Sequence, residues 1–309
     1  MKKKTVLITG INGFIGSSLK EVINKKYPSW NIYGIDRLGN KSNTIFKINV
    51  TNKSKLAGII SKEKPDYIFH LAGSTCRDNL KELLRENVVS TFTILEAVKS
   101  MDNYNPRIVI PSSAAEYGER QLNNNKFKES YPEKPVTLYG LSKAMQSRLS
   151  LLYASGGLNV VVARIFNIFG KGTPVSLSIG RFSRVLALIK KGKVPAVINT
   201  KSLDSKRDFL DIYDVCRYLL AVAIFGEKGQ VYNICRGKSY KMRYLLRKLI
   251  NLSGIRNIKV IEDKKDCKEN ALDDFVGSSC KINKIIKSNG LISIEQSLRE
   301  SYRYYLSRI

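Results

Sequence analysis

Tyr139 and Lys143 lie four residues apart in the segment Tyr-Gly-Leu-Ser-Lys. That spacing puts both side chains on one face of a helix. A lysine ammonium beside a phenol lowers the pKa of the phenol, which is about 10 in an isolated tyrosine, toward neutral pH. The pair therefore predicts a tyrosine that exchanges a proton, as hydride transfer at a carbonyl carbon requires.

Ser113 is the third candidate catalytic residue, and it follows a strand predicted over residues 107–112. In a doubly wound sheet the carboxyl ends of the strands form the ligand crevice, where Ser113 and the Tyr139 helix are expected to converge. A hydroxyl there can hydrogen-bond a substrate carbonyl oxygen and hold it toward Tyr139. The alternative is a serine that only caps the turn.

A glycine-rich turn begins at Gly10 and continues through Gly13 to Gly16, between an apolar strand over 4–9 and a helix over 17–24. This arrangement is typical of a turn that carries a dinucleotide pyrophosphate at the helix N-terminus. Asp36 ends a second strand and favours NAD through the adenine ribose, whereas the adjacent Arg37 favours the 2'-phosphate of NADP. The predicted cofactor is therefore NAD(P)H, with both forms left open.

The elements that must position these residues alternate between strand and helix, which predicts an α/β doubly wound parallel sheet of the Rossmann type. Residues 1–170 are predicted to form the dinucleotide-binding domain, and residues 171–309 a smaller, interleaved substrate-binding lobe. Residues 118–135 are expected to form an exposed loop before the Tyr139 helix. The predicted strands cover 4–9, 31–36, 45–49, 66–71, 107–112, 159–165 and 194–198, and later helices cover 179–191, 211–225, 241–253 and 294–307.

Cysteine and histidine content argues against a disulfide framework and a metal site. The five cysteines are scattered without a C-x-x-C spacing, which favours free thiols. His70 is the only histidine, which excludes mechanisms that need two. It ends an apolar strand, so a packed, hydrogen-bonded histidine is expected, and no metal site is predicted.

The net charge of +27 arises from 53 lysines and arginines against 26 acidic residues. The positive residues are spread along the chain, so specific nucleic-acid binding is not expected, although the field favours an anionic nucleotide diphosphate. No apolar stretch reaches the roughly 18 residues of a membrane helix, and the apolar segment after the N-terminal lysines is short. A cytoplasmic protein without membrane insertion is expected.

The combined motifs resemble those of the extended short-chain dehydrogenase/reductase family, which includes nucleotide-sugar epimerases, dehydratases and reductases. The resemblance covers nearly the whole chain. The motifs are the turn from Thr9 to Gly16, His70-Leu71-Ala72-Gly73, Asn87 with Thr91, Ser113, Tyr139 with Lys143, Arg164-Ile165-Phe166-Asn167, Arg207-Asp208-Phe209 and Val231-Tyr232-Asn233.

That resemblance implies roles for the residues. Tyr139 would be the proton donor, Lys143 would lower its pKa and bind the nicotinamide ribose, and Ser113 would polarise the carbonyl. Asn167 and Arg207 would bind the diphosphate of a nucleotide-diphosphate sugar. Asn49 stands where many relatives carry aspartate. The implied cofactor contacts are Gly10, Gly13, Phe14, Ile15, Gly16, Asp36, Arg37, Asn49, Val50, Leu71, Ala72, Gly73, Asn87, Tyr139, Lys143 and Phe166.

The reaction is narrowed by Ala114 and Ala115, which stand where dehydratases of this family carry an acidic pair. Alanine transfers no proton, so dehydration is not expected. The motifs look most like those of 4-keto-6-deoxyhexose reductases, which make GDP- or dTDP-linked deoxysugars for surface polysaccharide. A 4-epimerase of the UDP-glucose type and a non-catalytic nucleic-acid-binding relative are the alternatives.

A homodimer is expected from the same resemblance, through a four-helix bundle built from two helices of each subunit. The candidate helices cover roughly 79–100 and 138–154. Packing within the monomer would explain their apolar stripes equally well. The stripes include Leu83, Leu84, Leu95, Leu149 and Leu152.

Overall fold

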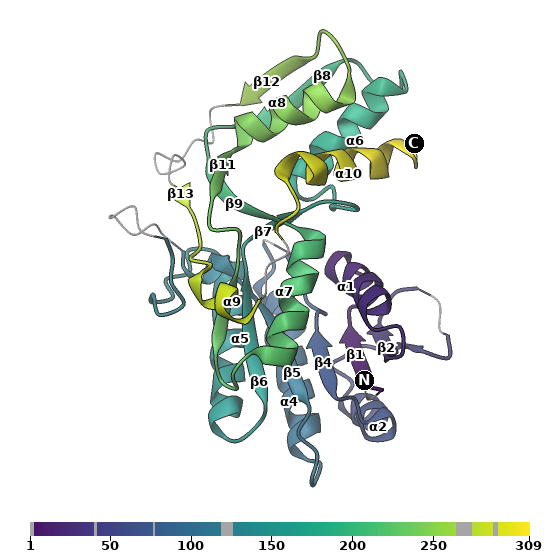
Figure 1. Cartoon of the computed structure of the whole chain (residues 1–309), viewed down its shortest axis with the longest axis vertical. Coiled ribbons are helices and arrows are strands. Elements are labelled where there is room, and N and C mark those ends of the chain that lie inside the picture. Colours follow the sequence, from purple (N-terminus) through teal and green to yellow (C-terminus); the bar gives the residue numbers. More distant parts are fainter. Residues whose placement is uncertain (1–2, 40–41, 77, 119–125, 264–273, 287–289) are drawn as a thin grey trace.

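Seven parallel strands form the central sheet, in the order β10-β6-β5-β4-β1-β2-β3 (Figure 1). The computed structural model describes residues 3–39, 42–76, 78–118, 126–263, 274–286 and 290–309. The α/β doubly wound parallel sheet predicted from the sequence is confirmed. The strands are β1 Thr5–Thr9, β2 Asn31–Asp36, β3 Ile45–Lys47, β4 Tyr67–His70, β5 Arg107–Ser113, β6 Val160–Ile165 and β10 Val231–Ile234.

Helices cover both faces of this sheet because alternate strand residues point to opposite sides. Val6 and Ile8 belong to the core beneath α1 and α7, whereas Leu7 belongs to the core beneath α2, α4 and α5. Both faces are therefore apolar, as expected for a buried parallel sheet. The helices are α1 Phe14–Lys26, α2 Lys53–Glu63, α4 Ser90–Lys99, α5 Leu138–Ser155 and α7 Ile212–Phe225.

The second lobe is built around short strands and three packed helices, drawn at the top of Figure 1. The sequence predicted only one strand in this lobe, over residues 194–198, and the corresponding strand lies at Val197–Lys201. The strands are β7 Asn167–Phe169, β9 Lys206–Asp211, β11 Ser239–Lys241 and β13 Asp274–Phe275 in one sheet, and β8 Val197–Lys201 with β12 Lys259–Asp263 in another. The helices are α6 Ser178–Lys190, α8 Met242–Ser253 and α10 Ile294–Leu306.

The two lobes are interleaved along the chain. After β6 the chain enters the second lobe, and it then returns to the central sheet with α7 and β10. The short helix α9, Cys280–Ile285, packs on both of those returning elements. A single boundary at residue 170 therefore does not separate the two lobes, because α7 and β10 lie after it but belong with the central sheet. The predicted boundary stays a proposal.

The helical segment expected over 79–100 contains a wider turn. It begins as α3, Leu80–Leu83, passes through the π-helical turn η1, Leu84–Val89, and continues as α4. Such turns interrupt α-helices frequently at functional sites. This one carries Glu86 and Asn87, which are both buried.

The segment predicted as an exposed loop over 118–135 is partly buried. Residues 119–125 lie outside the described residues. Phe127 is enclosed, with its ring stacked on Tyr117 at a centroid distance of 4.8 Å. The expectation of an exposed loop is therefore wrong at Phe127, because the polar composition of the segment hid one aromatic anchor.

Among the described residues, every helix is too short or too polar to span a lipid bilayer.

Candidate active site at the carboxyl ends of the parallel strands

Ser113 and Tyr139 meet at the carboxyl end of β5. Ser113 ends that strand, and Tyr139 lies in the first turn of α5. The Ser113 hydroxyl accepts a hydrogen bond from the backbone N–H of Ala115 at 3.2 Å, and it is also hydrogen-bonded to the phenol of Tyr139. The half-buried Tyr139 thus places its hydroxyl beside Ser113, the residue predicted to hold a substrate oxygen.

Lys143 lies one turn further along α5, but its ammonium faces the protein interior. It donates to the carbonyl oxygen of Pro111 at 2.7 Å and to Oε1 of Gln146. Burial lowers the pKa of Lys143 to about 8, and the negative charge of Glu116 partly opposes that shift.

The expectation that Lys143 lowers the pKa of Tyr139 is not met in this structure. Burial raises the pKa of the Tyr139 phenol; the hydrogen bond with Ser113 opposes the rise and Glu116 adds to it. The phenol is therefore held protonated at neutral pH. A protonated phenol is the form that a proton donor needs.

The glycine-rich turn connects β1 to α1 and fits a bound pyrophosphate. Gly10 has a φ of +67°, and a Cβ there would lie 2.9 Å from the backbone nitrogen of Ala72. A Cβ on Gly16 would lie 2.1 Å from the carbonyl oxygen of Gly10. Gly13 caps α1 without a side chain, so the first backbone N–H groups of the helix, beginning at Phe14, are left for a ligand.

At the end of β2, Asp36 faces the same turn. Its carboxylate oxygens accept hydrogen bonds from the backbone N–H groups of Asn12 and Leu38, each at 3.0 Å. Arg37 is half exposed and lies 3.3 Å from Oε1 of Glu86. The carboxylate and the guanidinium are both within the region expected for the adenine ribose, but each already has a protein partner.

Asn49 and Val50 lie beyond β3, which ends at Lys47 rather than at residue 49. The Asn49 side chain is exposed and accepts hydrogen bonds from the backbone N–H and the hydroxyl of Thr51, at 3.0 and 2.9 Å. Val50 is buried. Asn49 therefore holds its own turn, and its predicted contact with adenine stays a prediction.

His70 links the ends of β1 and β4. Its Nδ1 lies 2.8 Å from the Thr9 hydroxyl and its Nε2 lies 3.1 Å from the Ser90 hydroxyl. Thr9 also accepts from the backbone N–H of Ala72 at 3.1 Å, which fixes the Leu71–Gly73 segment beside Gly10. The expectation of a packed, hydrogen-bonded histidine is confirmed; Thr9 and Ser90 were not identified, because each needed a partner distant in sequence.

Because His70 is buried, we predict that the folded protein becomes less stable in acid. Burial, with the positive charge of Lys143, lowers the pKa of His70 to about 3. Because the unfolded histidine binds a proton near pH 6.5 and the folded one does not, stability falls as pH drops from about 6.5 toward 3. Between pH 7 and pH 5 this group alone should cost about 2 kcal/mol of unfolding free energy.

Urea unfolding at pH 7 and pH 5 checks this prediction, with His70→Gln as the comparison. The variant should be less stable at pH 7 but should lose about 2 kcal/mol less on acidification than the natural chain. An equal loss in both proteins would show that His70 takes up its proton in the folded state.

Asn87, on the π-helical turn, joins three segments around the site. Its Oδ1 accepts from the backbone N–H of Ser74 at 2.9 Å, and its Nδ2 donates to the Ser142 hydroxyl at 3.0 Å and to the Ser74 carbonyl at 3.1 Å. A Cβ on Gly73 would lie 2.7 Å from Asn87 Oδ1. Asn87 thus holds the segment that follows strand β4 against helix α5. This is the region where Asn87 is predicted to contact the cofactor.

Asn167 and Arg207, the predicted substrate residues, lie on paired strands of the second lobe. Strand β7 runs parallel to β9, with Asn167 opposite Phe209. The Asn167 amide donates to the Asp208 carbonyl at 3.0 Å, and Arg207 donates to the Lys206 carbonyl at 2.8 Å. The two residues therefore lie on neighbouring strands, and their binding of a substrate diphosphate stays a prediction.

Phe166 is enclosed by other aromatic residues, and its predicted contact with the cofactor stays a prediction. Its side chain is buried in an aromatic cluster with Tyr117 and Phe275, at centroid distances of 6.2 and 5.7 Å. The sequence showed only a phenylalanine between two motif residues. Its depth in the core depends on Phe275, which is more than one hundred residues away.

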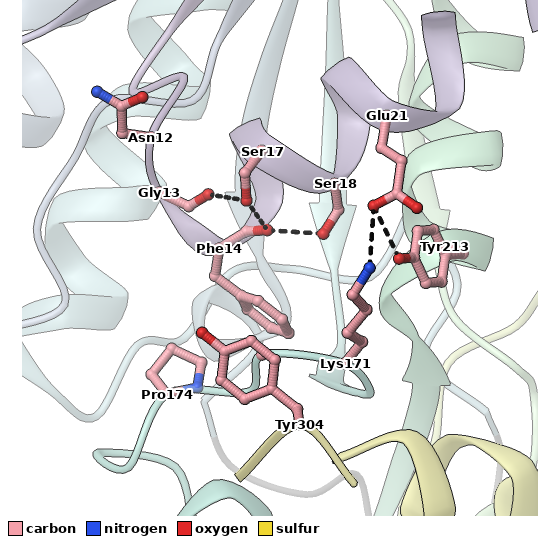
Figure 2. Close-up of a pocket in the computed structure, with 11 residues that line it drawn as sticks. Asn12, Gly13, Phe14, Ser17, Ser18, Glu21, Lys171, Pro174, Tyr213 and Tyr304 are labelled. Atoms are coloured by element: carbon pink, nitrogen blue, oxygen red, sulfur yellow. Dashed lines mark hydrogen bonds and ion pairs between the residues drawn. The ribbon is translucent and has the colours of Figure 1, made fainter. Parts of the chain in front are cut away.

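A pocket of about 250 Å³ separates the start of α1 from the second lobe (Figure 2). Glu21 of α1 crosses it, because its Oε2 lies 3.5 Å from Lys171 Nζ and accepts from the Tyr213 hydroxyl at 2.9 Å. None of these three residues is among the site residues predicted from the sequence. The pocket is lined by Asn12, Gly13, Phe14, Ser17, Ser18, Glu21, Lys171, Gly172, Pro174, Tyr213 and Tyr304.

Comparisons with known proteins find relatives along nearly the whole chain. The model of the NAD dependent epimerase/dehydratase family matches residues 6–235. The chain is 27% identical to GDP-6-deoxy-D-mannose reductase of Pseudomonas aeruginosa, over 98% of each protein. It is 24% identical to GDP-6-deoxy-D-talose 4-dehydrogenase of Aggregatibacter actinomycetemcomitans, over 96% of this chain and 97% of that one. The solved structure of RMD from Pseudomonas aeruginosa complexed with NADPH has a TM-score of 0.88 and 26% identity, over 99% of this chain and 100% of that one.

Proposed function

Because the chain belongs to the NAD-dependent epimerase/dehydratase family, we propose that it is a nucleotide-sugar 4-keto reductase. It is an NAD(P)-dependent enzyme that acts on nucleotide sugars, and the finer proposal concerns the reaction. The proposed substrate is a GDP- or dTDP-linked 4-keto-6-deoxyhexose. The observation that carries the proposal is the placement of Tyr139, in the first turn of α5, beside Ser113 at the end of β5, where the Ser113 hydroxyl acts on the Tyr139 phenol.

Reduction is favoured over dehydration by the turn that follows Ser113. Ala114 and Ala115 offer no acid or base, and Glu116, the only carboxylate of that turn, is fully buried against Arg164. Elimination of water needs an acid and a base at adjacent sugar carbons. Because the turn offers no proton donor or acceptor, we assign the proton transfer to Tyr139. The similarity to GDP-6-deoxy-D-mannose reductase supports a GDP-linked sugar as the substrate.

The proposed mechanism assigns each residue one task. The bound nicotinamide would supply hydride to the 4-keto carbon. Ser113 would donate a hydrogen bond to the keto oxygen, and Tyr139 would deliver the proton to it as the carbon is reduced. The N-terminal N–H groups of α1 would bind the cofactor pyrophosphate. Asn167 and Arg207 would bind the substrate diphosphate, for which a guanidinium offers paired donors.

The test is oxidation of NADH and NADPH, followed by absorbance, with GDP- and dTDP-linked 4-keto-6-deoxyhexoses. Stoichiometric oxidation with one of them supports the reductase and identifies its base. The two cofactors are compared because Asp36 favours NAD and Arg37 favours NADP. UDP-glucose and UDP-galactose are incubated in parallel without added cofactor, and their interconversion without net oxidation would assign a 4-epimerase instead.

The product of this reaction would be an activated deoxysugar for surface polysaccharide, made in the cytoplasm. That role is proposed together with the reaction. It would be contradicted by a chain that turns over no keto sugar under these conditions.

A homodimer is proposed through one face of α4 and α5, which pack against each other. Two of the leucines that suggested this face, Leu83 and Leu95, are fully buried and belong to the core of the monomer. The exposed large apolar side chains on these helices and on the adjoining π-helical turn share only Leu152 with the predicted stripes. They are Val89, Phe92, Leu138, Leu141, Met145 and Leu152.

Replacing Met145 and Leu152 together with glutamate should dissociate this dimer. Each buried apolar side chain contributes about 1.5–3 kcal/mol and recurs in both subunits, so the dissociation constant should rise at least about 100-fold. Light scattering after gel filtration measures the mass. Phe225→Glu is the control, because Phe225 is 61% exposed, close to the 67% of Leu152, but lies on α7. Dissociation by the control alone would place the interface elsewhere.

A further inference from the structure

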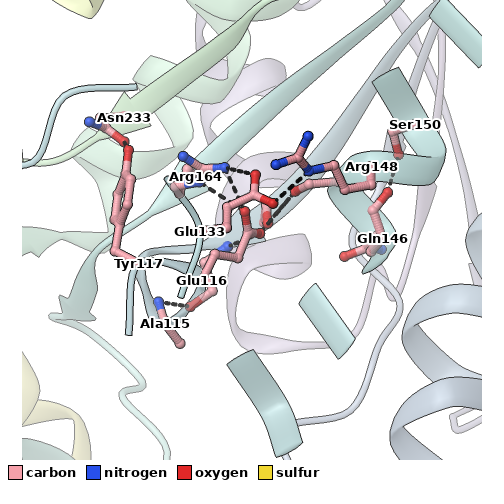
Figure 3. A network of polar contacts seen from close by, with 12 residues as sticks. Ala115, Glu116, Tyr117, Glu133, Gln146, Arg148, Ser150, Arg164 and Asn233 are labelled. Atoms are coloured by element: carbon pink, nitrogen blue, oxygen red, sulfur yellow. Dashed lines mark hydrogen bonds and ion pairs between the residues drawn. The ribbon is translucent and has the colours of Figure 1, made fainter. Parts of the chain in front are cut away.

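Glu116 is a buried carboxylate directly behind the catalytic pair. It is the third residue of the short 3-10 helix η2, Ala114–Glu116, and its side chain has no exposed surface. Figure 3 shows it pointing away from Ala115 toward Arg164 and Glu133. Neither the proposed mechanism nor the motif pattern assigns this residue a task.

The two carboxylate oxygens of Glu116 hold different parts of the protein. Oε1 lies 3.4 Å from the backbone nitrogen of Ser113, which donates to it, and 2.9 Å from the hydroxyl of Ser147 on α5. Oε2 accepts from Arg164 Nε on β6 at 2.9 Å. One side chain thus connects the residue that carries the catalytic hydroxyl to the helix that carries Tyr139 and to the neighbouring strand.

Arg164 extends the connection into a chain of four charges. Its Nη2 lies 2.7 Å from Glu116 Oε2 and 2.8 Å from Glu133 Oε1, and Glu133 in turn accepts from Arg148 Nε at 2.8 Å. The guanidinium also lies over the ring of Tyr117 at 4.5 Å. The charge of Arg164 offsets the cost of burying the Glu116 carboxylate, and Arg148, which is largely exposed, adds a second positive charge beside Glu133.

We propose that Glu116 is a positioning residue, which fixes the turn behind Ser113 so that the Ser113 hydroxyl and the Tyr139 phenol stay in contact. This inference rests on the proposed function, because that contact matters only if Tyr139 donates a proton. Removing the carboxylate would take away the hydrogen bonds that join the Ser113 backbone to Ser147 of α5 and to Arg164 of β6, and would let Ser113 move relative to α5. Displacements of this kind reduce turnover strongly without abolishing binding.

The negative charge of Glu116 has a second effect on the same pair. It raises the pKa of Tyr139, in addition to burial, and it raises the pKa of Lys143, whose own burial lowers it. Burial raises the pKa of Glu116 itself, and Arg164 and Ser147 oppose that rise. Glu133 is a further charged group that faces Glu116, and it raises the pKa of Glu116. Loss of the Glu116 charge should therefore lower the pKa of both Tyr139 and Lys143.

Glu116→Gln is the test, because the amide keeps the shape but has one acceptor oxygen for the donors that two carboxylate oxygens serve. With the keto sugar and NAD(P)H, kcat should fall about 10- to 100-fold while the cofactor dissociation constant stays within about twofold. The alkaline limb of the kcat profile should move to lower pH, because the phenol loses its proton earlier.

Glu133→Gln is the matched control. Glu133 binds the same Arg164 but makes no contact with Ser113 among the described residues. It should keep kcat within about threefold and leave the alkaline limb in place, because the Ser113 turn is untouched. Equal losses in the two variants would mean that Glu116 acts only through the ion-pair network, and the positioning role would be overturned.

Two further measurements keep the inference separate from folding and from the reductase assignment. NMR of protein labelled at tyrosine Cζ, with Tyr139→Phe to assign the signal, reports the ionisation of Tyr139 without any substrate. An unshifted pKa of Tyr139 in Glu116→Gln would contradict the electrostatic effect.

Thermal unfolding establishes whether the Glu116→Gln variant is folded. If it is not, Ser147→Ala, which frees Oε1 from α5 but keeps the ion pair, should lower kcat about three- to tenfold. Full activity of that variant would refute the role.

Discussion

Replacing Tyr139 with phenylalanine will lower kcat by about 100- to 10,000-fold, the usual contribution of a positioned proton donor. The ring is retained, so packing in the first turn of α5 is preserved. The hydroxyl that is lost is the one hydrogen-bonded to Ser113. Cofactor affinity should change by no more than about twofold, because the substitution removes an interaction made in the transition state.

Steady-state oxidation of NAD(P)H and cofactor fluorescence titration measure the two quantities. Tyr153→Phe is the matched control, because Tyr153 lies on the same helix but its hydroxyl binds Glu96, away from Ser113. The control should retain kcat within about threefold. Normal turnover by Tyr139→Phe would reject the assignment of Tyr139 as proton donor.

Gly16→Ala is expected to abolish useful cofactor binding. The new Cβ would lie 2.1 Å from the carbonyl oxygen of Gly10 and 2.8 Å from the Cα of Ile11. Both are backbone atoms of the glycine-rich turn, so the turn itself must move away from the helix N-terminus. Overpacking of this kind costs about 1–3 kcal/mol, and a loss of about 2.7 kcal/mol in binding raises the dissociation constant about 100-fold.

Fluorescence titration with NADH and NADPH measures the loss, and thermal unfolding shows whether the fold survives. Gly58→Ala is the control, because a Cβ at Gly58 on α2 would meet no atom within 4 Å. Alanine is the better helix former, so this variant should bind cofactor normally and gain about 0.5–1 kcal/mol of stability. Unimpaired cofactor binding by Gly16→Ala would show that the turn yields without cost.

The sequence was sufficient for those parts of the site whose spacing is local or whose position follows from strand order. The turn from Gly10 to Gly16 lies between β1 and α1 as expected. Ser113 and Tyr139 meet because parallel strands present their carboxyl ends on one edge of the sheet. His70 is packed and hydrogen-bonded because it ends an apolar strand.

The parts that could not be predicted depend on partners distant in the chain. The Lys143 ammonium donates to the carbonyl oxygen of Pro111, on another element, and this partner could not be read from the four-residue spacing to Tyr139. In the sequence, Glu116 cannot be distinguished from other polar residues of a turn, because its partner Arg164 is distant in the chain. Phe166 follows the same rule, since only the fold reveals the aromatic cluster that encloses it.

The interleaved order of the lobes also constrains how the chain is made on the ribosome. Strand β6 is buried along all six of its residues, but its outer neighbour in the sheet, β10, is synthesised more than sixty residues later. During that interval the outer edge of β6, whose side chains are apolar except for Arg164, is unpaired, and unpaired sheet edges associate with other chains. The nascent protein therefore has a period of aggregation risk, which ends only when β10 emerges and closes the sheet.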